Sequence, residues 1–370
     1  MRPLTYLTFD SLQEGVGASQ ALSYVLKIAK SRKVRIISFE KISPSLDLIE
    51  TMSRSEIIWE PLEFGKFGTL GGVSRVFRMS REIDRKSIVH ARGNLAAISA
   101  LIRNPQRWIW DCRSMHSDQR LALSSNGKSN FIYWIMRAIE MLLAKFSSQI
   151  IVITNAVKLE FVSRYRISNE KMTMISTCVD VTKFEKTELP SLKQIRILLS
   201  GTFSSAYDLI LINKIIGEIR ERSEVHVTVA ASLGATESWQ DIQYDDYVSV
   251  PHSKMPGLIA DSHLGFSIWK NSLGVCLKSV ASTKTAEFLA MGRPVFINSA
   301  QGDFQELFDS YDIGVVTSDS DDESVKFYVD RMFSLLSSTD TAEKCHKLAA
   351  ENFSLEDGVS KLLEIYEELD

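Results

Sequence analysis

Short apolar runs alternate with amphipathic segments along almost the whole chain, and this alternation constrains the fold more than any single motif. Nearly continuous apolar runs are typical of strands that are covered on both faces in a parallel sheet. Helical patterns between them predict the helices that cover those faces. In the first half we expect strands at 4–10, 34–39, 88–91, 108–111, 150–154 and 172–176, and helices near 19–31, 72–84, 94–103, 129–146 and 155–165.

The alternation restarts after a polar stretch at 183–194, which we interpret as an interdomain linker because it carries charges, a proline and no periodicity. A chain of 370 residues also exceeds the size at which one core stops growing, about 250–300 residues. We therefore predict two Rossmann-like domains, at 1–187 and 188–352, with a final helix at 353–370 that packs back on the first domain. The second half should hold strands at 195–200, 225–230, 247–250, 264–268, 294–297 and 314–317, and helices near 206–221, 254–261, 283–291, 303–310, 321–337 and from 339 onward.

Composition excludes several classes of protein. The 43 basic and 46 acidic side chains give a net charge of −3, which argues against a nucleic-acid binder. Cys112, Cys178, Cys276 and Cys345 are far apart, so neither a zinc site nor a disulfide scaffold is expected, and reduced thiols fit a cytoplasmic location. No apolar run is long enough to predict a membrane-spanning helix, and the first residues lack the apolar core of a signal peptide.

The first candidate site is a glycine loop. In doubly wound sheets, ligands bind where strands lead into helices. The segment Gly15-Val-Gly17-Ala-Ser19-Gln20 stands between the first predicted strand and its helix, where glycines let main-chain N–H groups approach an anion. It is consistent with a sugar or phosphate loop, with a nicotinamide dinucleotide site in which Glu40 holds the ribose, or with a plain helix cap.

A second group of polar residues follows two neighbouring strands. His90 and Arg92 end one strand, and Asp111, Arg113 and His116 follow the next. Because parallel strands end at the same edge of a sheet, these side chains should gather there and form a ligand site. The alternative for each residue is a local role, as a helix cap or as one half of an Asp–Arg pair.

The third group opens a helix of the second half. Ser282 is a good N-cap residue and places Thr283 and Lys284 in the first turn, where free N–H groups, a hydroxyl and an ammonium converge. This arrangement suits a diphosphate without a metal. Glu287 lies one turn further on the same face and can accept the hydroxyls of a ribose. The alternative is that Lys284 and Glu287 only form a solvent-exposed pair.

These residues carry a resemblance to a known family. The segment STKTAEFLAMGRPV (282–295) resembles the donor-binding segment of family 4 type glycosyltransferases, which have the GT-B fold: two Rossmann-like doubly wound domains that face each other across a cleft. The resemblance extends in order over most of the chain. It includes GVGASQALSYVLKIAK near the start, SIVHARGNLAAISALI, WIWDCRSMHSDQ, IIVITNAVKLEFVSRY and KMTMISTCVDVTKF.

The resemblance implies a retaining, metal-independent glycosyltransferase that uses a nucleotide sugar, UDP- or GDP-linked, as substrate and needs no cofactor. It implies that Glu287 binds the ribose, that Thr283, Lys284 and the neighbouring main chain bind the diphosphate, and that Gly17 lies over the donor sugar or acceptor. We add Ser282, Gly201 and Thr202 to the expected nucleotide-binding residues. Lys284, Asp111, Arg113 and His116 are the expected catalytic residues.

Two departures from the family pattern keep other functions open. Ser279 stands where the family usually has a glutamate, and Gly201, Thr202 and Phe203 stand where it often has an Arg and a Lys. The alternatives are a GT-B epimerase or phosphorylase, and a catalytically impaired partner protein that binds sugar nucleotides. Asp245-Asp246 and Asp321-Asp322 lie in polar runs and are interpreted as solvated charges, so no metal site is expected.

The expected partners are the nucleotide-sugar donor and a saccharide or lipid-linked acceptor, in the assembly of surface polysaccharide or glycolipid. Two segments, 131–146 and 66–85, combine aromatic, aliphatic and basic residues. They predict peripheral contact with the inner face of the cell membrane. The alternative for 131–146 is a helix that is buried against the sheet.

Overall fold

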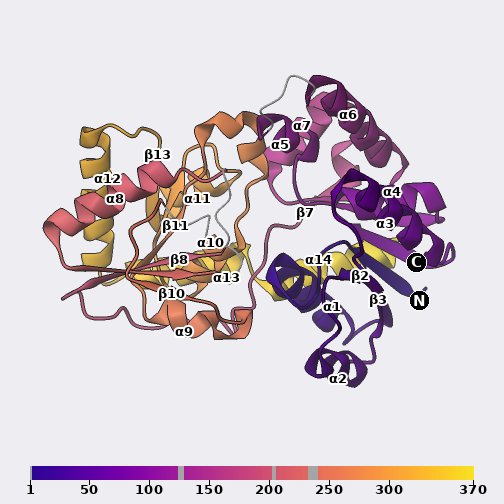
Figure 1. Cartoon of the computed structure of the whole chain (residues 1–370), viewed down its shortest axis with the longest axis horizontal. Coiled ribbons are helices and arrows are strands. Elements are labelled where there is room, and N and C mark those ends of the chain that lie inside the picture. The colour runs from indigo at the N-terminus through magenta and orange to yellow at the C-terminus, as the bar shows by residue number, and fades with distance from the viewer. Residues whose placement is uncertain (1, 124–128, 202–205, 232–240) are drawn as a thin grey trace. The chain divides into compact units, whose positions relative to one another are not determined.

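Two parallel β-sheets organise the chain, in a computed structural model that describes residues 2–123, 129–201, 206–231 and 241–370 (Figure 1). The chain divides into an N-terminal unit, formed by Met1–Ser176 together with Leu355–Asp370, and a C-terminal unit, Thr177–Ser354. Each unit contains one sheet with helices on its faces. The structure therefore has the α/β class and the two Rossmann-like domains that the alternation predicts.

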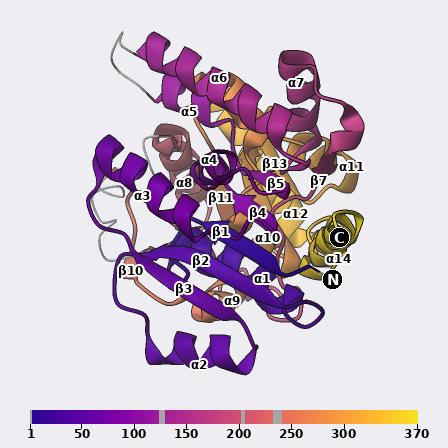
Figure 2. The ribbon, with the colours of Figure 1, turned by 90° about the vertical axis from the view of Figure 1, so that its right-hand side faces the viewer.

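The N-terminal unit has a seven-stranded sheet in the order β3-β2-β1-β4-β5-β6-β7, with every neighbouring pair parallel. All residues of β1 and β4 are buried, as expected for central strands. Helices α3, α4 and α6 pack together, and α14 packs against α1 (Figure 2). The strands are β1 (Leu4–Thr8), β2 (Val34–Glu40), β3 (Ile58–Glu63), β4 (Ile88–Arg92), β5 (Arg107–Cys112), β6 (Gln149–Val152) and β7 (Met172–Met174). The helices are η1 (Gly17–Leu22), α1 (Ser23–Ile28), α2 (Leu46–Arg54), α3 (Gly68–Glu82), α4 (Asn94–Arg103), α5 (His116–Ala122), α6 (Ser129–Phe146), α7 (Asn155–Tyr165), η2 (Asn169–Lys171) and α14 (Leu355–Glu368).

The C-terminal unit has a six-stranded parallel sheet in the order β10-β9-β8-β11-β12-β13. One layer of its core lies under α8 and α12, and the other lies under α9, α10, α11 and α13 (Figure 1). The strands are β8 (Ile195–Ser200), β9 (Val225–Ala230), β10 (Asp246–Val248), β11 (Leu264–Ser267), β12 (Val295–Asn298) and β13 (Gly314–Thr317). The helices are α8 (Leu209–Arg222), η4 (His252–Lys254), α9 (Met255–Ala260), η5 (Asn271–Ser279), α10 (Thr283–Ala290), α11 (Phe304–Tyr311), α12 (Asp322–Ser337) and α13 (Thr341–Asn352).

The segment interpreted as a linker is fastened to the C-terminal unit. The fully buried guanidinium of Arg293 donates to the carbonyl oxygens of Thr187 at 2.8 Å and Glu188 at 2.9 Å, and to the Thr187 hydroxyl at 2.6 Å. The boundary between the units accordingly falls between Ser176 and Thr177, before the polar stretch rather than within it.

The strand order of each sheet reverses at one point. In the N-terminal unit the chain moves outward from β1 through β2 to β3, then returns to the other side of β1 with β4. In the C-terminal unit the corresponding reversal lies between β8 and β11. Loops that leave the carboxyl ends of the strands separate at such a point and leave room for a ligand. The residues just after β1, β4, β5 and β8 are therefore the first candidates for function.

Among the described residues, no helix is both long enough and apolar enough to cross a membrane. The four cysteines are buried, and no disulfide joins them.

Candidate functional site

The N-terminus of α10 forms the first half of the site. Ser282 has extended backbone geometry and ends the preceding loop, and the first main-chain bond of the helix runs from the Ala286 N–H to the Ser282 carbonyl. The N–H groups of the first turn therefore have no partner within the helix. Together with the helix dipole they make this end of α10 attractive to an anion.

Lys284 extends from this turn to the end of β8. Its Nζ atom lies 4.6 Å from the ring centroid of Tyr207. A Cβ atom on Gly201 would lie 3.7 Å from that nitrogen, and Gly201 has a φ of +89° that favours glycine. Burial lowers the pKa of Lys284 to about 7, although the charge of Glu287 opposes the shift. The amine thus lies at the switch point of the C-terminal sheet, and an incoming anion would restore its charge.

Glu287 is buried and bound to a histidine that the sequence analysis missed. The Oε1 atom of Glu287 lies 2.6 Å from Nε2 of His252, and the Glu287 side chain is 7% exposed. Burial lowers the pKa of His252, but the hydrogen bond and the charge of Glu287 outweigh burial and raise the pKa above its ordinary value. Phe184 packs against the imidazole ring. His252 therefore forms a hydrogen bond with the same carboxylate that is expected to bind the ribose.

Ser279 ends η5, the turn that precedes α10. Its hydroxyl donates to the carbonyl oxygen of Cys276 at 2.8 Å. The residue at this position therefore stabilises its own turn rather than presenting a carboxylate.

Gly17 begins η1, directly after the loop that follows β1, at the other switch point. A Cβ atom there would lie 1.9 Å from the Ser11 carbonyl oxygen, so only glycine fits. The loop is held by Glu40, whose carboxylate accepts from the Ser11 hydroxyl at 2.5 Å and from the Leu12 N–H at 3.0 Å. Glu40 is thus engaged in positioning the loop, which argues against the nicotinamide interpretation.

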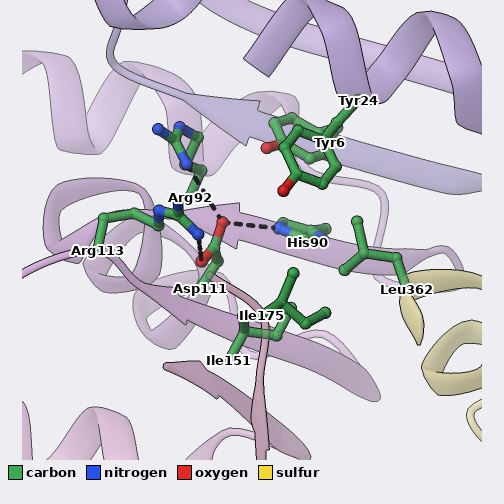
Figure 3. A pocket seen from close by; sticks show the side chains of 9 residues that line it. All are labelled: Tyr6, Tyr24, His90, Arg92, Asp111, Arg113, Ile151, Ile175 and Leu362. Carbon is green, nitrogen blue, oxygen red and sulfur yellow. Dashed lines mark hydrogen bonds and ion pairs between the residues drawn. The ribbon is translucent and has the colours of Figure 1, made fainter. Parts of the chain in front are cut away.

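Polar residues of β4 and β5 gather around a small pocket of the N-terminal unit (Figure 3). Asp111 Oδ2 lies 3.3 Å from His90 Nε2 and 3.5 Å from Arg92 Nη1, and Asp111 Oδ1 lies 3.4 Å from Arg113 Nη1. Burial raises the pKa of Asp111, but Arg113, His90 and Arg92 together hold it well below its ordinary value. Asp111 is therefore an ionised carboxylate between two guanidinium groups. The pocket is lined by Tyr6, Tyr24, His90, Arg92, Asp111, Arg113, Ile151, Ile175 and Leu362.

His90 connects this cluster to the C-terminal helix. Its Nδ1 atom lies 2.7 Å from the Tyr366 hydroxyl of α14, and its ring stacks on Tyr6 at 4.4 Å between centroids. Burial lowers the pKa of His90 more than its bond to Asp111 raises it, so the ring is neutral at pH 7. An ionised carboxylate only accepts hydrogen bonds, so Nε2 carries the proton and Nδ1 accepts from Tyr366.

His116 begins α5 and does not line this pocket. Burial lowers its pKa, with a smaller opposing effect from Glu140. Glu140 itself is buried and accepts from the Ser117 hydroxyl at 2.6 Å, the Ser117 N–H at 3.0 Å and the Tyr165 hydroxyl at 2.9 Å. These bonds fix the start of α5 against α6 and α7.

No protein-family model matches the sequence, and no curated protein sequence matches it. Solved structures match it over nearly its full length. Sucrose-phosphate synthase from Thermosynechococcus elongatus has a TM-score of 0.76 at 10% identity, covering 100% of this chain and 99% of that chain. HepE from Anabaena, in complex with UDP and glucose, has a TM-score of 0.70 at 14% identity, covering 99% and 100%. A glycosyltransferase from Rickettsia africae has a TM-score of 0.68 at 14% identity, covering 99% and 98%.

The chain has the GT-B fold. Its structural neighbours at nearly full coverage include GT-B glycosyltransferases, as the resemblance of the sequence predicts.

The GT-B structure brings some of the predicted residues together. Lys284 meets Gly201, Glu287 lies one turn along the same helix, and Ser282 and Thr283 form the start of that helix. In the other unit, Asp111 contacts Arg113, whereas Gly17 begins η1 and His116 begins α5. Thr202 lies outside the described residues. Whether these residues act as assigned stays a prediction.

Sequence reasoning missed three side chains that contact the predicted ones. His252 follows the end of a strand, and that position was the available signal for it. Tyr207 and Tyr366 had no local signal, because each meets its partner only through tertiary packing. Among the described residues, no group of three or more His, Cys, Asp and Glu side chains could hold a metal ion.

Proposed function

We propose that the chain is a retaining glycosyltransferase that moves a sugar from a nucleotide sugar to a saccharide or lipid-linked acceptor, in the assembly of surface polysaccharide or glycolipid. The observation that carries the proposal is the α10 N-terminus, where free N–H groups, the Lys284 amine and the Glu287 carboxylate lie beside the end of β8. The fold supports it, and the neighbour HepE was solved with UDP and glucose.

The proposed chemistry depends on charge that develops on the leaving group. The acceptor hydroxyl attacks the anomeric carbon, the bond from that carbon to the diphosphate oxygen breaks, and the nucleoside diphosphate leaves with the electron pair. Lys284 and the start of α10 stabilise the negative charge that grows on the diphosphate. We propose front-face substitution, in which the departing phosphate oxygen takes the acceptor proton, because the sequence offers no clear candidate for the nucleophilic carboxylate that a double displacement needs.

The donor is the first point to test. Thermal shifts with UDP-, GDP-, ADP- and CMP-sugars should identify the base, since a ligand that binds only the folded state raises stability. Glu287→Ala should weaken binding of that nucleotide about a hundredfold or more, because it removes two hydrogen bonds to a charged group, which contribute about 1.5–3 kcal/mol each. Glu306→Ala, an exposed change on α11, is the matched control. Unchanged affinity in folded Glu287→Ala would refute the ribose assignment.

The role of Lys284 has a kinetic test. Activity should persist in excess EDTA, and Lys284→Ala should lower turnover about a hundredfold or more while weakening donor binding less, because the contact strengthens in the transition state. Lys326→Ala, an exposed change on α12, should leave both unchanged. Loss of activity in EDTA that Mg²⁺ restores would contradict the metal-free mechanism. Product analysis by NMR should give the anomeric configuration of the donor.

We also propose that α6 contacts an anionic membrane that presents the acceptor. Phe131 and Trp134 are 74% and 65% exposed, Phe146 is 54% exposed, and Lys145 lies 5.8 Å from the Phe146 ring centroid. The face is therefore apolar and basic, rather than buried against the sheet. Co-sedimentation with vesicles should rise with anionic lipid content and fall in Phe131→Ser/Trp134→Ser. Self-association without vesicle binding would assign the face to a second copy instead.

A further inference from the structure

Arg92 is a buried cation whose hydrogen-bonding capacity is unused. Its side chain is 5% exposed and lines the pocket of Figure 3, yet among the described residues it makes no hydrogen bond. Its nearest carboxylate contacts are 3.5 Å to Asp111 and 3.6 Å to Asp10. Hydrogen bonds between a guanidinium and a carboxylate are normally about 2.7–2.9 Å long. The positive charge of Arg92 is thus partly compensated by these carboxylates, but its N–H donors have no acceptor at hydrogen-bond distance among the described residues.

Two other buried arginines of the chain show how a guanidinium is hydrogen-bonded when its role is structural. Arg293 spreads its donors over the carbonyls of Ser262, Thr187, Met291, Glu188 and Ala260 at 2.8–3.0 Å. Arg75 donates to the carbonyls of Phe64 at 3.1 Å and Lys66 at 2.7 Å. Each of these two guanidinium groups donates at least two hydrogen bonds to main-chain carbonyls, although the Nε atom of Arg75, like that of Arg92, has no partner among the described residues. The exception at Arg92 therefore requires an explanation.

The groups around Arg92 are also donors. Arg113 lines the same pocket, and its bond to Asp111 is long, at 3.4 Å. The hydroxyl of Tyr6 makes no hydrogen bond to the described residues, and Figure 3 shows it on the same side of the pocket as Arg92. Burial raises the pKa of Tyr6 well above its ordinary value, so this hydroxyl keeps its proton and can donate.

The charges favour a single anion. Arg92, Arg113 and Asp111 are the charged groups that line the pocket, with side chains 5%, 16% and 5% exposed, and together they carry one net positive charge. Asp10 is half-exposed and screened by solvent. The pocket is much smaller than ordinary ligand pockets, which measure roughly 300–1,000 Å³. It suits one oxyanion group rather than a whole nucleotide sugar.

We propose that this pocket binds an oxyanion, a phosphate or carboxylate group, through Arg92, Arg113 and the Tyr6 hydroxyl. Its place at the switch point between β1 and β4 is where the fold presents ligands. The anion is part of the acceptor, an identification that rests on the proposed glycosyltransferase function. The enzyme accordingly selects an acidic acceptor.

Calorimetric titration at constant ionic strength tests the pocket directly. Inorganic phosphate and glucuronate are titrated separately into the whole protein, so that the two arms distinguish a phosphate from a carboxylate. At least one should bind, and Arg92→Gln should weaken it about tenfold or more, because charge-assisted hydrogen bonds are lost. Arg75→Gln removes a buried arginine of the same unit outside the pocket and should leave the affinity unchanged.

Further variants keep each outcome decisive. Arg113→Gln, at a more exposed position, replaces Arg92→Gln if the latter does not fold, and should weaken the same anion. Lys284→Met should not affect it, because the expected diphosphate site lies in the other unit. Failure of both probes to bind, or binding that only Lys284→Met weakens, would overturn the proposal. Separate titration with the nucleotide sugar tests the proposed function, so the two failures are distinguishable.

Discussion

Gly17 illustrates how far a single residue can be constrained. Because the Ser11 carbonyl would lie 1.9 Å from any Cβ atom, Gly17→Ala should displace the loop that Glu40 holds. We expect a loss of about 1–3 kcal/mol in the free energy of unfolding, the usual cost of overpacking. Chemical denaturation followed by tryptophan fluorescence measures it. Gly72→Ala is the control, since it has open space and should be neutral or slightly stabilising. Equal stability of both variants would contradict the close approach.

The His252–Glu287 pair predicts a pH dependence. The pKa of His252 is raised in the folded protein, despite burial and the nearby charge of Lys183. The stabilisation from the pair is therefore fully present below the ordinary histidine pKa, about 6.5, and is lost as the pH rises through the raised pKa.

The measurement compares melting temperatures of the wild type and His252→Gln across the pH range of about 6 to 9, where the histidine titrates. The melting temperature of the wild type should exceed that of the variant most at the acidic end of this range, and the difference should decline toward the alkaline end. A difference that does not change with pH would show that the charged pair is absent. Nucleotide affinity should move in the opposite direction, because deprotonation of His252 frees Glu287 for the ribose.

At the scale of elements, periodicity predicted most of the fold, and the exceptions have physical causes. β3 was missed because it is an edge strand, contains Pro61 and is largely exposed, so it lacks the apolar run of a central strand. α2 and α5 were also missed, because with nine and seven residues each is too short to be distinguished as a helix by its pattern alone. The start of α10 was predictable because helix caps are local. The contacts of His252 and Tyr366 were not, because they depend on packing between distant segments.

Arg293 shows how one side chain can hold three segments together. It joins the end of α9, the turn after α10 and the segment at Thr187–Glu188, and burial lowers its pKa to about 10. Arg293→Met should lower the stability of the C-terminal unit by about 3–5 kcal/mol, because several buried carbonyls lose their donor. Urea unfolding measures this, with exposed Arg196→Met as the control. Similar midpoints for the two variants would refute the role.

At the scale of the whole molecule, the N-terminal unit is completed by the helix that comes last in the chain. Tyr366 is fully buried and donates to His90, so Tyr366→Phe leaves a buried acceptor without its donor. We expect a loss of about 1–3 kcal/mol. Because two units need not unfold together, hydrogen exchange resolved by segment is the suitable measurement. Protection should fall in β4 and β5 but not in β8 to β13, and a uniform fall would contradict the assignment of α14 to the N-terminal unit.

The position of α14 also has a consequence for biosynthesis. The ribosome makes the β1–β7 segment first, but α14 emerges only after the entire C-terminal unit has been synthesised. Until then His90 and the surface of α1 lack their partners. Domains generally fold as they are made, N-terminal first, at about 5–20 residues per second. The nascent N-terminal unit must therefore wait many seconds with an uncovered apolar face, and we expect chaperones to bind that face until α14 arrives.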